Sequence, residues 1–256
     1  METKSTLLGQ RIRYFRKRSG LSQLELETQI GTSAGSISRI ENGEVNPTKE
    51  TLTKIAEILK LLPREIEYLM GITSLPVSED QIEKVREVMK PYLQKKGTLA
   101  YILDDRARTI DASNDFLRMI GYSPENKELV LGKSIIRIVI DPALKVKEHL
   151  ESNYEETLYN LLSRFYVEVG FMEDDPYFSE ALEYIKSDEI ASRMWSEVTS
   201  KKVTDIHLLN RRMVKFNIKG FNVPLVYSVE QIAEYPRFNL VEYIPSNLVL
   251  RILRNL

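Results

Sequence analysis

Residues 20–43 read GLSQLELETQIGTSAGSISRIENG, and this stretch decides the fold of the first part of the chain. Ser22 is a good helix cap, and Glu25 follows it three residues later, which is the spacing of a capping box. Gly31 supplies the stop for the helix that begins there. The stretch therefore predicts a helix between Ser22 and Gly31, followed by a tight turn.

A second helix is expected after a turn of only a few residues, with Ser33 as its cap and Asn42-Gly43 at its end. Ile37 and Ile40 are three residues apart, as a buried stripe requires. Small residues are poor helix formers on an isolated surface, so they favour a helix that presses close to another polymer. The length and polarity of this helix suit the major groove of DNA. Its outer face carries Ala34, Gly35, Ser38 and Arg39.

Amphipathic stretches flank this pair of helices on both sides. The helix before the pair has three apolar residues on its inward side: Leu8, Ile12 and Phe15. Its outward side is expected to be basic: Arg11, Arg13, Lys17 and Arg18. The helix after the pair follows Pro47-Thr48 and turns four residues inward: Leu52, Ile55, Ala56 and Leu59.

These motifs resemble the Cro/C1-type helix-turn-helix family, also called the XRE family, over roughly residues 7–70. The resemblance implies five helices, a structural salt bridge between Arg16 and Glu41, and a dimer on operator DNA. It also implies that Gln23 contacts a phosphate or the first base, and that Ser36 and Asn42 contact the DNA backbone. The complete set of expected DNA contacts is Arg13, Lys17, Gln23, Ser33, Ala34, Gly35, Ser36, Ser38, Arg39 and Asn42.

Arg39 is the expected guanine reader within this set, because the guanidinium fork matches O6 and N7 of guanine. A phosphate contact is the alternative for Arg39. The resemblance departs from the family at Ala34 and Gly35, where many members carry longer polar side chains, so direct readout there should be thin.

Composition sets bounds on the rest of the chain. The 256 residues suggest two domains, and the formal net charge of −1 excludes a uniformly basic nucleic-acid coat. The basic charge is local, within residues 11–18. Cysteine is absent, which excludes disulfides, thiolate zinc sites and cysteine nucleophiles. There is no apolar signal region and no apolar run of about 20 residues, so we expect a soluble, cytoplasmic protein without a membrane partner.

A hinge is expected at residues 71–76, followed by a charged helix from about Ser78. Its apolar seam either pairs with a second copy or packs on its own domain, and the second reading is favoured because Pro91 cuts the run short. The predicted division is 1–72 for the helix-turn-helix domain, 73–97 for a linker helix and 98–256 for the second domain. The seam consists of Ile82, Val85, Met89 and Tyr92.

The second domain begins with two strands, over 99–103 and 108–112, and a short helix that Asn114 should cap. Its middle is helical, and clean alternation then predicts strands over 214–218, 223–229 and 238–244. The opening resembles a PAS sensor domain, and the order over roughly 80–248 resembles the PAS-like domain of MmyB-type regulators. The fold class is thus α+β, an all-α unit followed by a PAS-like unit with an antiparallel sheet and a helical insert.

The MmyB-type resemblance implies a sensor for small apolar, fatty-acid-like molecules. The pocket would be lined by aromatic residues, although ordinary core is the alternative role for each. Arg211 and Arg212 could anchor a carboxylate, with solvated surface as the alternative. The expected lining is Tyr101, Phe116, Phe165, Trp195, Phe216 and Tyr243.

The sequence offers little for catalysis or metal binding. His149 and His207 are the only histidines and lie far apart, so we expect no metal and no cofactor. No phosphate-binding glycine loop, metalloprotease motif or nucleophile elbow is present, and nothing indicates a self-cleaving peptidase. An enzyme is therefore not expected.

Two functions remain open at this point. The first is a sequence-specific transcriptional regulator of repressor type that binds an operator as a homodimer and responds to a small apolar effector. The second keeps the DNA-binding unit but makes the second domain a ligand-free dimerisation or protein-interaction module.

Overall fold

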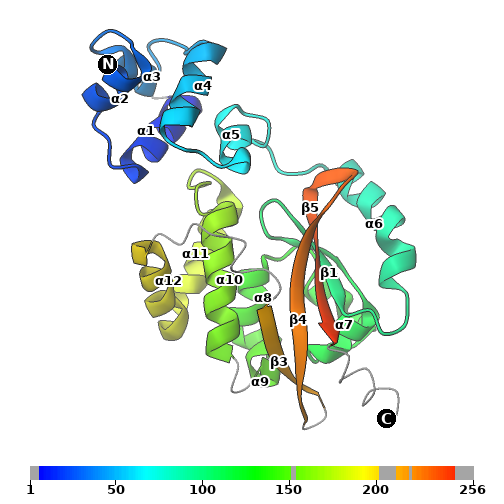
Figure 1. Ribbon diagram of the computed structural model, residues 1–256. Coiled ribbons are helices and arrows are strands. Elements are labelled where there is room, and N and C mark those ends of the chain that lie inside the picture. Colours follow the sequence, from blue (N-terminus) through cyan, green and yellow to red (C-terminus); the bar gives the residue numbers. More distant parts are fainter. Residues whose placement is uncertain (1–5, 151–153, 202–211, 219–220, 246–256) are drawn as a thin grey trace. The chain divides into compact units, whose positions relative to one another are not determined.

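The computed structural model describes residues 6–150, 154–201, 212–218 and 221–245 (Figure 1). The chain divides into two compact units, Met1–Pro76 and Val77–Leu256.

The first unit is made of helices alone within its described residues. Thr6, Ser22 and Thr48 cap three of these helices through their side-chain oxygens. Ile12, Phe15 and their neighbours on the other helices form a dry core. The helices are α1 (Leu7–Arg18), α2 (Gln23–Ile30), α3 (Ser36–Glu41), α4 (Lys49–Ile58) and α5 (Pro63–Leu69).

The start of α3 differs from the sequence prediction. The helix begins at Ser36, and Gly35 precedes it in the left-handed region at φ +83°. Ala34 and Gly35 therefore lie in the turn before the helix and not on its outer face. Ser33 does not cap α3, because its hydroxyl bonds with the Ser36 hydroxyl at 2.9 Å.

α1 and α3 approach each other closely at Gly9. A Cβ atom at this position would lie 2.5 Å from the Glu41 carbonyl oxygen. No side chain fits such a gap without moving the backbone, so glycine is required where the two helices meet.

The second unit is built on one sheet with helices on both faces. Its chain begins with a helix and two strands, continues through a helical insertion and returns to three strands. The elements are α6 (Glu79–Leu93), β1 (Ala100–Asp104), β2 (Thr109–Ala112), α7 (Asn114–Met119), the 3-10 turn η1 (Pro124–Leu129), α8 (Ile135–Ile140), the 3-10 turn η2 (Pro142–Leu144), α9 (Val146–Leu150), α10 (Tyr154–Val169), α11 (Pro176–Ser187), α12 (Glu189–Lys201), β3 (Arg212–Ile218), β4 (Phe221–Ile232) and β5 (Tyr235–Pro245).

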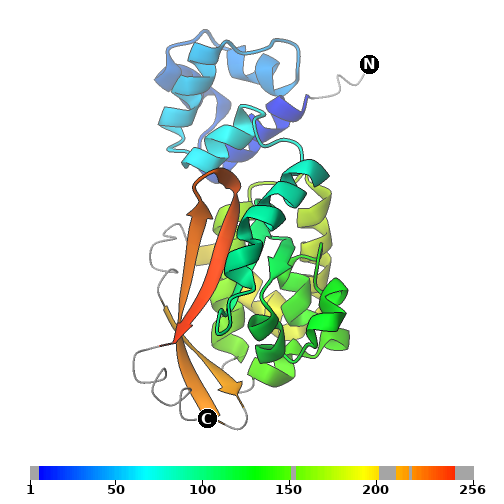
Figure 2. The ribbon, with the colours of Figure 1, turned by 90° about the vertical axis from the view of Figure 1, so that its right-hand side faces the viewer.

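The five strands have the order β2-β1-β5-β4-β3, and each neighbouring pair is antiparallel. β1 therefore pairs with a strand from the far end of the chain, and Tyr101 lies opposite Val241. β4 and β5 form the long hairpin drawn in orange and red in Figure 2.

The two faces of the sheet are covered by different helices. Ala100 and Ile102 pack against Ile82 and Val85 of α6. Because strand side chains alternate, Tyr101 points to the opposite face, which the helical insertion covers. Figure 1 shows α6 and helices α8–α12 on opposite sides of the strands.

α6 settles against its own unit, as favoured from its sequence. Ile82 and Val85 are buried, Met89 packs beside them, and the Tyr92 hydroxyl bonds with Glu242 of β5. The helix continues to Leu93 although Pro91 lies inside it, so the expected break does not occur there.

The β1–β2 turn is tied to the helical insertion by buried charge. Arg106 is fully buried, and its Nε donates to Asp175 at 3.0 Å, at the start of α11. Its NH1 lies 2.9 Å from Asp105, which also accepts from Arg237 of β5 at 2.6 Å. Residues distant in sequence thus meet at one corner of the sheet.

Other local predictions need correction or lie outside the described residues. Ser113, not Asn114, caps α7, because its hydroxyl accepts the Phe116 N–H at 3.2 Å while Asn114 is already helical. Arg211 and His207 fall outside the described residues, and the structure does not describe the Arg212 side chain. In the described ranges no helix has the length and apolar character needed to cross a membrane.

Candidate nucleic-acid interface and apolar cavity

α2 and α3 are held in a fixed relation by two buried carboxylates. The first is Glu27, whose Oε1 accepts the backbone N–H of Ile37 at 2.8 Å. This bond satisfies one of the free donors at the start of α3, which no side chain of its own caps. Sequence reasoning missed this role of Glu27, because the acceptor lies ten residues before the donor.

The second carboxylate is Glu41, at the end of α3, and it is fully buried. Arg16 donates to it from Nε at 2.6 Å and from NH2 at 3.0 Å, which is the expected structural salt bridge. Arg13 Nε and Gln23 Nε2 donate to its Oε2 at 3.2 and 2.8 Å. We call Glu41 and these three donors the Glu41 network.

The Glu41 network is electrostatically matched. Burial alone raises the pKa of Glu41, but hydrogen bonds from Arg16 and Gln23 and the charge of Arg16 outweigh it, so the pKa lies below its ordinary value. Glu41 is therefore an anion that fastens the end of α3 to α1 and α2.

The residues expected to contact DNA differ in how free their side chains are. Arg39 is 62% exposed, and among the described residues its ion pair is a distant one, with Nε 3.9 Å from Glu44 Oε2. The other exposed members are Lys17, Ser33, Ala34 and Gly35, and the half-buried ones are Ser36, Ser38 and Asn42.

Gln23 and Arg13 are engaged inside the unit. Gln23 donates to Glu41, and Arg13 donates to Glu41 and, from NH2, to the Asn42 side chain at 2.8 Å. The Arg13 side chain is still 37% exposed. A DNA contact by either residue would therefore share the side chain with the Glu41 network.

The prediction of an outward basic face on α1 was wrong for Arg11. Its guanidinium donates to the Tyr68 carbonyl at 2.9 Å and to Ser74 Oγ at 2.8 Å, and it stacks 3.8 Å from the Tyr68 ring. Arg18 pairs with Glu65 of α5. Partners in α5 and in the turn after it, 47 to 63 residues later, carry no signal in the local sequence of α1.

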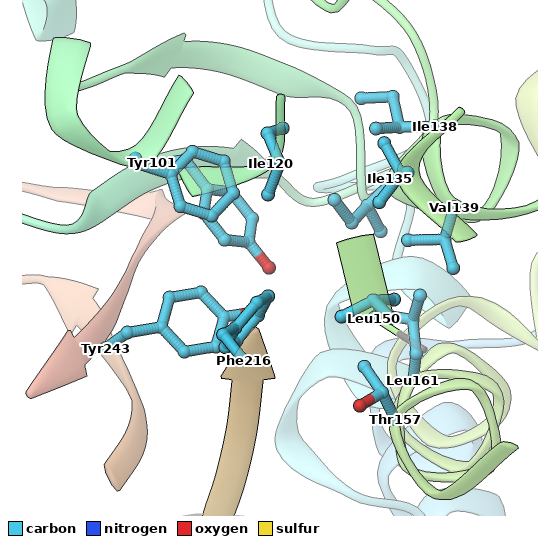
Figure 3. Close-up of a pocket in the computed structure, with 12 residues that line it drawn as sticks. Tyr101, Ile120, Ile135, Ile138, Val139, Leu150, Thr157, Leu161, Phe216 and Tyr243 are labelled. Atoms are coloured by element: carbon cyan, nitrogen blue, oxygen red, sulfur yellow. The ribbon is translucent and has the colours of Figure 1, made fainter. Parts of the chain in front are cut away.

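A small apolar cavity lies in the second unit between the sheet and the helical insertion. Its volume is about 40 Å³. In Figure 3, Tyr101, Phe216 and Tyr243 lie on one side, and residues of α8, α9 and α10 lie on the other. The full lining is Tyr101, Phe116, Ile120, Ile135, Ile138, Val139, Val146, Leu150, Thr157, Leu161, Phe216 and Tyr243.

Four of the six predicted pocket residues line this cavity, and their rings contact one another. The ring centroids of Tyr101 and Phe116 are 4.6 Å apart, those of Phe116 and Tyr243 are 5.8 Å apart, and those of Phe216 and Tyr243 are 5.0 Å apart. Burial raises the pKa of Tyr101 well above its ordinary value, so its hydroxyl stays protonated and can donate.

Phe165 and Trp195 do not line the cavity. They pack with Phe178 in a separate cluster among α10, α11 and α12, with centroids 5.8 Å apart for Phe165 and Phe178 and 6.0 Å apart for Phe165 and Trp195. The aliphatic half of the cavity was not predicted, although the apolar run of α8, Ile135–Ile140, was an available signal.

Comparison with known proteins agrees with the geometry of the first unit. The helix-turn-helix family model matches residues 12–66. The chain is 36% identical over 107 residues to the HTH-type transcriptional repressor RghR of Bacillus subtilis (strain 168), a match that covers 41% of this chain and 69% of that protein. It is 29% identical over 118 residues to the HTH-type transcriptional regulator DicA of Escherichia coli (strain K12), covering 36% of this chain and 87% of that protein.

The first unit is thus a DNA-binding helix-turn-helix module. The chain belongs to the Cro/C1-type (XRE) family of helix-turn-helix transcriptional regulators.

Proposed function

We propose that this regulator binds operator DNA as a symmetric dimer, with α3 of each copy in the major groove, and that a small apolar effector in the second unit adjusts that binding. The observation that carries the DNA-binding part is α3 itself, held by Glu27 and Glu41 while Arg39 stays exposed. Two copies would read half-sites about 34 Å apart, one helical turn of DNA.

The exposed and half-buried residues expected to contact DNA divide into three roles in this proposal. Arg39 reads a guanine, because it is the long polar side chain of the reading set and its ion pair with Glu44 is weak. Ser33, Ser36, Ser38 and Asn42 contact the backbone or base edges, and Lys17 contacts a phosphate. Ala34 and Gly35, placed in the turn before α3, allow close approach and contribute little direct readout.

The second unit is proposed to be PAS-like and of the MmyB type. Its support is the antiparallel sheet that opens with β1, β2 and α7, the helical insertion, and the return of the chain to β3, β4 and β5. The apolar cavity between the sheet and the insertion supports an effector with fatty-acid-like character. Such an effector shifts DNA binding only as far as it prefers one arrangement of the dimer over another.

The relatives' names favour repression as the outcome, since one of them is a transcriptional repressor. Bound effector would then either strengthen or release the dimer on its operator. Both cases need the ligand site of the second unit and DNA contact by α3.

Selection of bound sequences from random double-stranded DNA, combined with native mass spectrometry of the full chain, tests the proposal. We expect a palindromic site with two half-sites one helical turn apart and a complex of two chains per duplex. An asymmetric single site bound by one chain would overturn dimeric binding. Failure to enrich any sequence would overturn specific readout by α3.

A second function is favoured by one observation, the small size of the cavity. Its volume of about 40 Å³ is close to what one or two water molecules occupy. In this case the second unit is a dimerisation or protein-interaction module without a ligand. Denaturing mass spectrometry that releases no small molecule, together with no binding of added apolar compounds, would favour this function.

A further inference from the structure

A second hollow of the second unit is an open groove between α6, β2 and the turn that follows η1. Its volume is about 450 Å³, which lies in the usual range of sites for small molecules. Ile82 of α6 and Ile110 of β2 line it, and both belong to the core on the α6 face of the sheet. This space, which we call the α6 groove, is therefore separate from the apolar cavity on the opposite face.

The charges that line the α6 groove are of both signs and equal in number. A ligand with only negative charge would meet carboxylates there, and a ligand with only positive charge would meet cations. The arrangement therefore favours a molecule that carries one charge of each sign. The cationic residues are Arg86, Arg108 and Lys127, and the acidic residues are Glu79, Asp111 and Glu128.

The two arginines of the groove are held in place by fixed acceptors. Arg86 donates from Nε to the Ile110 carbonyl at 3.1 Å and from NH1 to Glu83 at 2.6 Å. Its NH2 has no hydrogen-bond partner within the described part of the chain, and the side chain is 32% exposed. Arg86 can therefore bind an anion without giving up its present bonds, and a carboxylate matches its guanidinium well.

Arg108 adds a second fixed positive charge to the groove. Its Nε donates to Asp104 at 2.6 Å, and its guanidinium stacks on the Tyr177 ring at 4.3 Å. The residue is 8% exposed, so it is a buried cation beside the groove more than a freely moving one. Its charge strengthens the attraction of Arg86 for an anion, because the partly buried position screens it less than bulk water would.

The acidic residues differ in how far they are already neutralised. Asp111 bonds with Lys127 and accepts the backbone N–H of Ala112 at 2.6 Å. Glu79 and Glu128 are exposed, and neither side chain has an ion pair or a hydrogen bond with another described residue. These two carboxylates are therefore the acceptors available to an ammonium group in the groove.

The groove also offers apolar surface between its charges. Ile82 and Ile110 are almost completely buried, and Leu131 is half-buried. A short aliphatic side chain would gain by covering this surface. An α-amino acid carries a carboxylate, an ammonium group and a side chain on one carbon atom, so it brings together the three groups that the lining favours.

We propose that the α6 groove binds a zwitterionic α-amino acid with an aliphatic side chain. The carboxylate lies at Arg86, the ammonium group lies at Glu79 and Glu128, and the side chain lies against Leu131. This is a second ligand site, beyond the proposed function, and it depends neither on an apolar effector nor on binding to DNA.

The test is isothermal titration of the full chain at neutral pH with three molecules of similar shape. They are L-leucine, 4-methylpentanoate, which lacks the ammonium group, and 3-methylbutylamine, which lacks the carboxylate. We expect leucine to bind roughly tenfold to a hundredfold more tightly than either analogue, as for the loss of a hydrogen bond between charged groups. An analogue that binds as tightly as leucine would overturn recognition of the missing group, and no binding by leucine would overturn the site.

Arg86→Gln tests the carboxylate end of the site. We expect this variant to lose the preference for leucine over 3-methylbutylamine and to keep the preference for leucine over 4-methylpentanoate. Lys84→Gln is the matched control, since Lys84 lies on the same helix, pairs with Asp80 at 2.7 Å and does not line the groove. Both preferences should persist in this control. An unchanged preference over the amine in Arg86→Gln would contradict the proposal.

Glu79→Gln combined with Glu128→Gln tests the ammonium end. We expect the double variant to lose the preference for leucine over 4-methylpentanoate and to keep the preference over the amine. Glu87→Gln, an exposed change on α6 outside the groove, is the control. General loosening of the fold would weaken both preferences together in each variant, and that result would overturn the assignment of the two ends.

DNA binding by the same preparations separates this inference from the proposed function. If leucine binds and no operator is selected, the amino-acid site stands and the DNA-binding proposal fails. If an operator is selected and leucine does not bind, the amino-acid site fails and the DNA-binding proposal stands.

Discussion

The two units each contain a buried arginine–glutamate pair, and the pairs differ in how completely they are satisfied. In the Glu41 network a carboxylate with no exposed surface receives donors from three side chains. At Arg164 one nitrogen is paired with Glu168 and two buried nitrogens are not, within the described residues. A network whose donors and acceptors all have hydrogen-bond partners fixes one geometry. A pair with unpartnered donors is less strongly fixed, because another arrangement of the side chains can satisfy them.

The largest effect should come from breaking the satisfied network. Glu41→Ala leaves Arg16 buried without its partner, and we expect the first unit to lose about 3–5 kcal/mol of stability. Amide hydrogen exchange of α1, α2 and α3 measures the loss in that unit alone. Glu44→Ala, at an exposed site beside Arg39, is the control and should change stability by less than about 0.5 kcal/mol. A loss below about 1 kcal/mol for Glu41→Ala would show that the network does not hold α3.

Removing both charges at Arg164 and Glu168 should have a much smaller effect on stability. We expect the free energy of unfolding of Arg164→Met combined with Glu168→Met to stay within about 1 kcal/mol of the parent's, because apolar side chains of similar size replace a costly buried pair. Thermal unfolding followed by Trp195 fluorescence reports on the second unit. A loss as large as that of Glu41→Ala would mean that the two pairs do not differ in kind.

Arg39→Ala tests whether Arg39, on the helix that the Glu41 network holds in place, reads a base. We expect specific DNA binding to weaken by about 1–3 kcal/mol and one base position to become tolerant. Fluorescence anisotropy with the selected operator and with scrambled DNA measures both affinities. An equal loss on the two duplexes would assign Arg39 to a phosphate.

Lys17→Ala is the matched variant for the phosphate role. It should weaken binding to both duplexes alike and lower the dependence of log affinity on log salt by about one unit. No change in that slope would remove Lys17 from the interface.

Gly9→Ala tests the close packing of α1 against α3 beside the Glu41 network. In the interior of an ordinary helix this change stabilises, but here the new Cβ would lie 2.5 Å from the Glu41 carbonyl oxygen. We therefore expect a loss of about 1–3 kcal/mol, measured by urea unfolding of the first unit. Gln29→Ala, an exposed change on α2, serves as the control. A gain in stability would mean that α1 and α3 are not in close contact.

The smallest expected effect is a dependence of the free energy of unfolding on pH in the acid range. The pKa of Glu41 lies below its ordinary value of 4.5, so the folded state binds fewer protons than the unfolded state. Its contribution to stability is therefore complete above the ordinary value and is lost as the pH falls through the lowered one. Urea unfolding over this range should show the loss in the parent and a shallower slope in Glu41→Ala. Equal slopes of the free energy of unfolding against pH in the two proteins would exclude Glu41 as the source of the loss.

The sequence predicted best what is decided over a few residues. The capping box at Ser22 and the stop at Gly31 appear as expected, because each depends on neighbours within one helical turn. The start of α3 was wrong, because the left-handed Gly35 outweighed the capping tendency of Ser33. Likewise Asn114 was chosen as a cap one residue too late, beside the equally suitable Ser113.

Contacts between distant segments were predicted less well. The inward turn of Arg11 depends on Tyr68 and Ser74, which nothing in α1 indicates. Four of the six aromatic residues expected to line a pocket do line the cavity, but their periodicity could not distinguish it from the separate cluster of Phe165, which is buried, and Trp195, which is half-buried. Which helix covers which part of the sheet depends on packing between segments, and this information is not local.

The pairing of β1 with β5 has a consequence for how the protein is made. The first unit is closed by contacts within residues that leave the ribosome early, and it can fold as soon as they emerge. β1 must wait for β5, so one of its edges stays unpaired until β5 is synthesised. At about 5–20 residues per second this interval lasts roughly 10–30 s. For that time a folded DNA-binding unit is attached to an incomplete sheet. A nascent chain can then meet DNA before its second unit is able to respond to any effector.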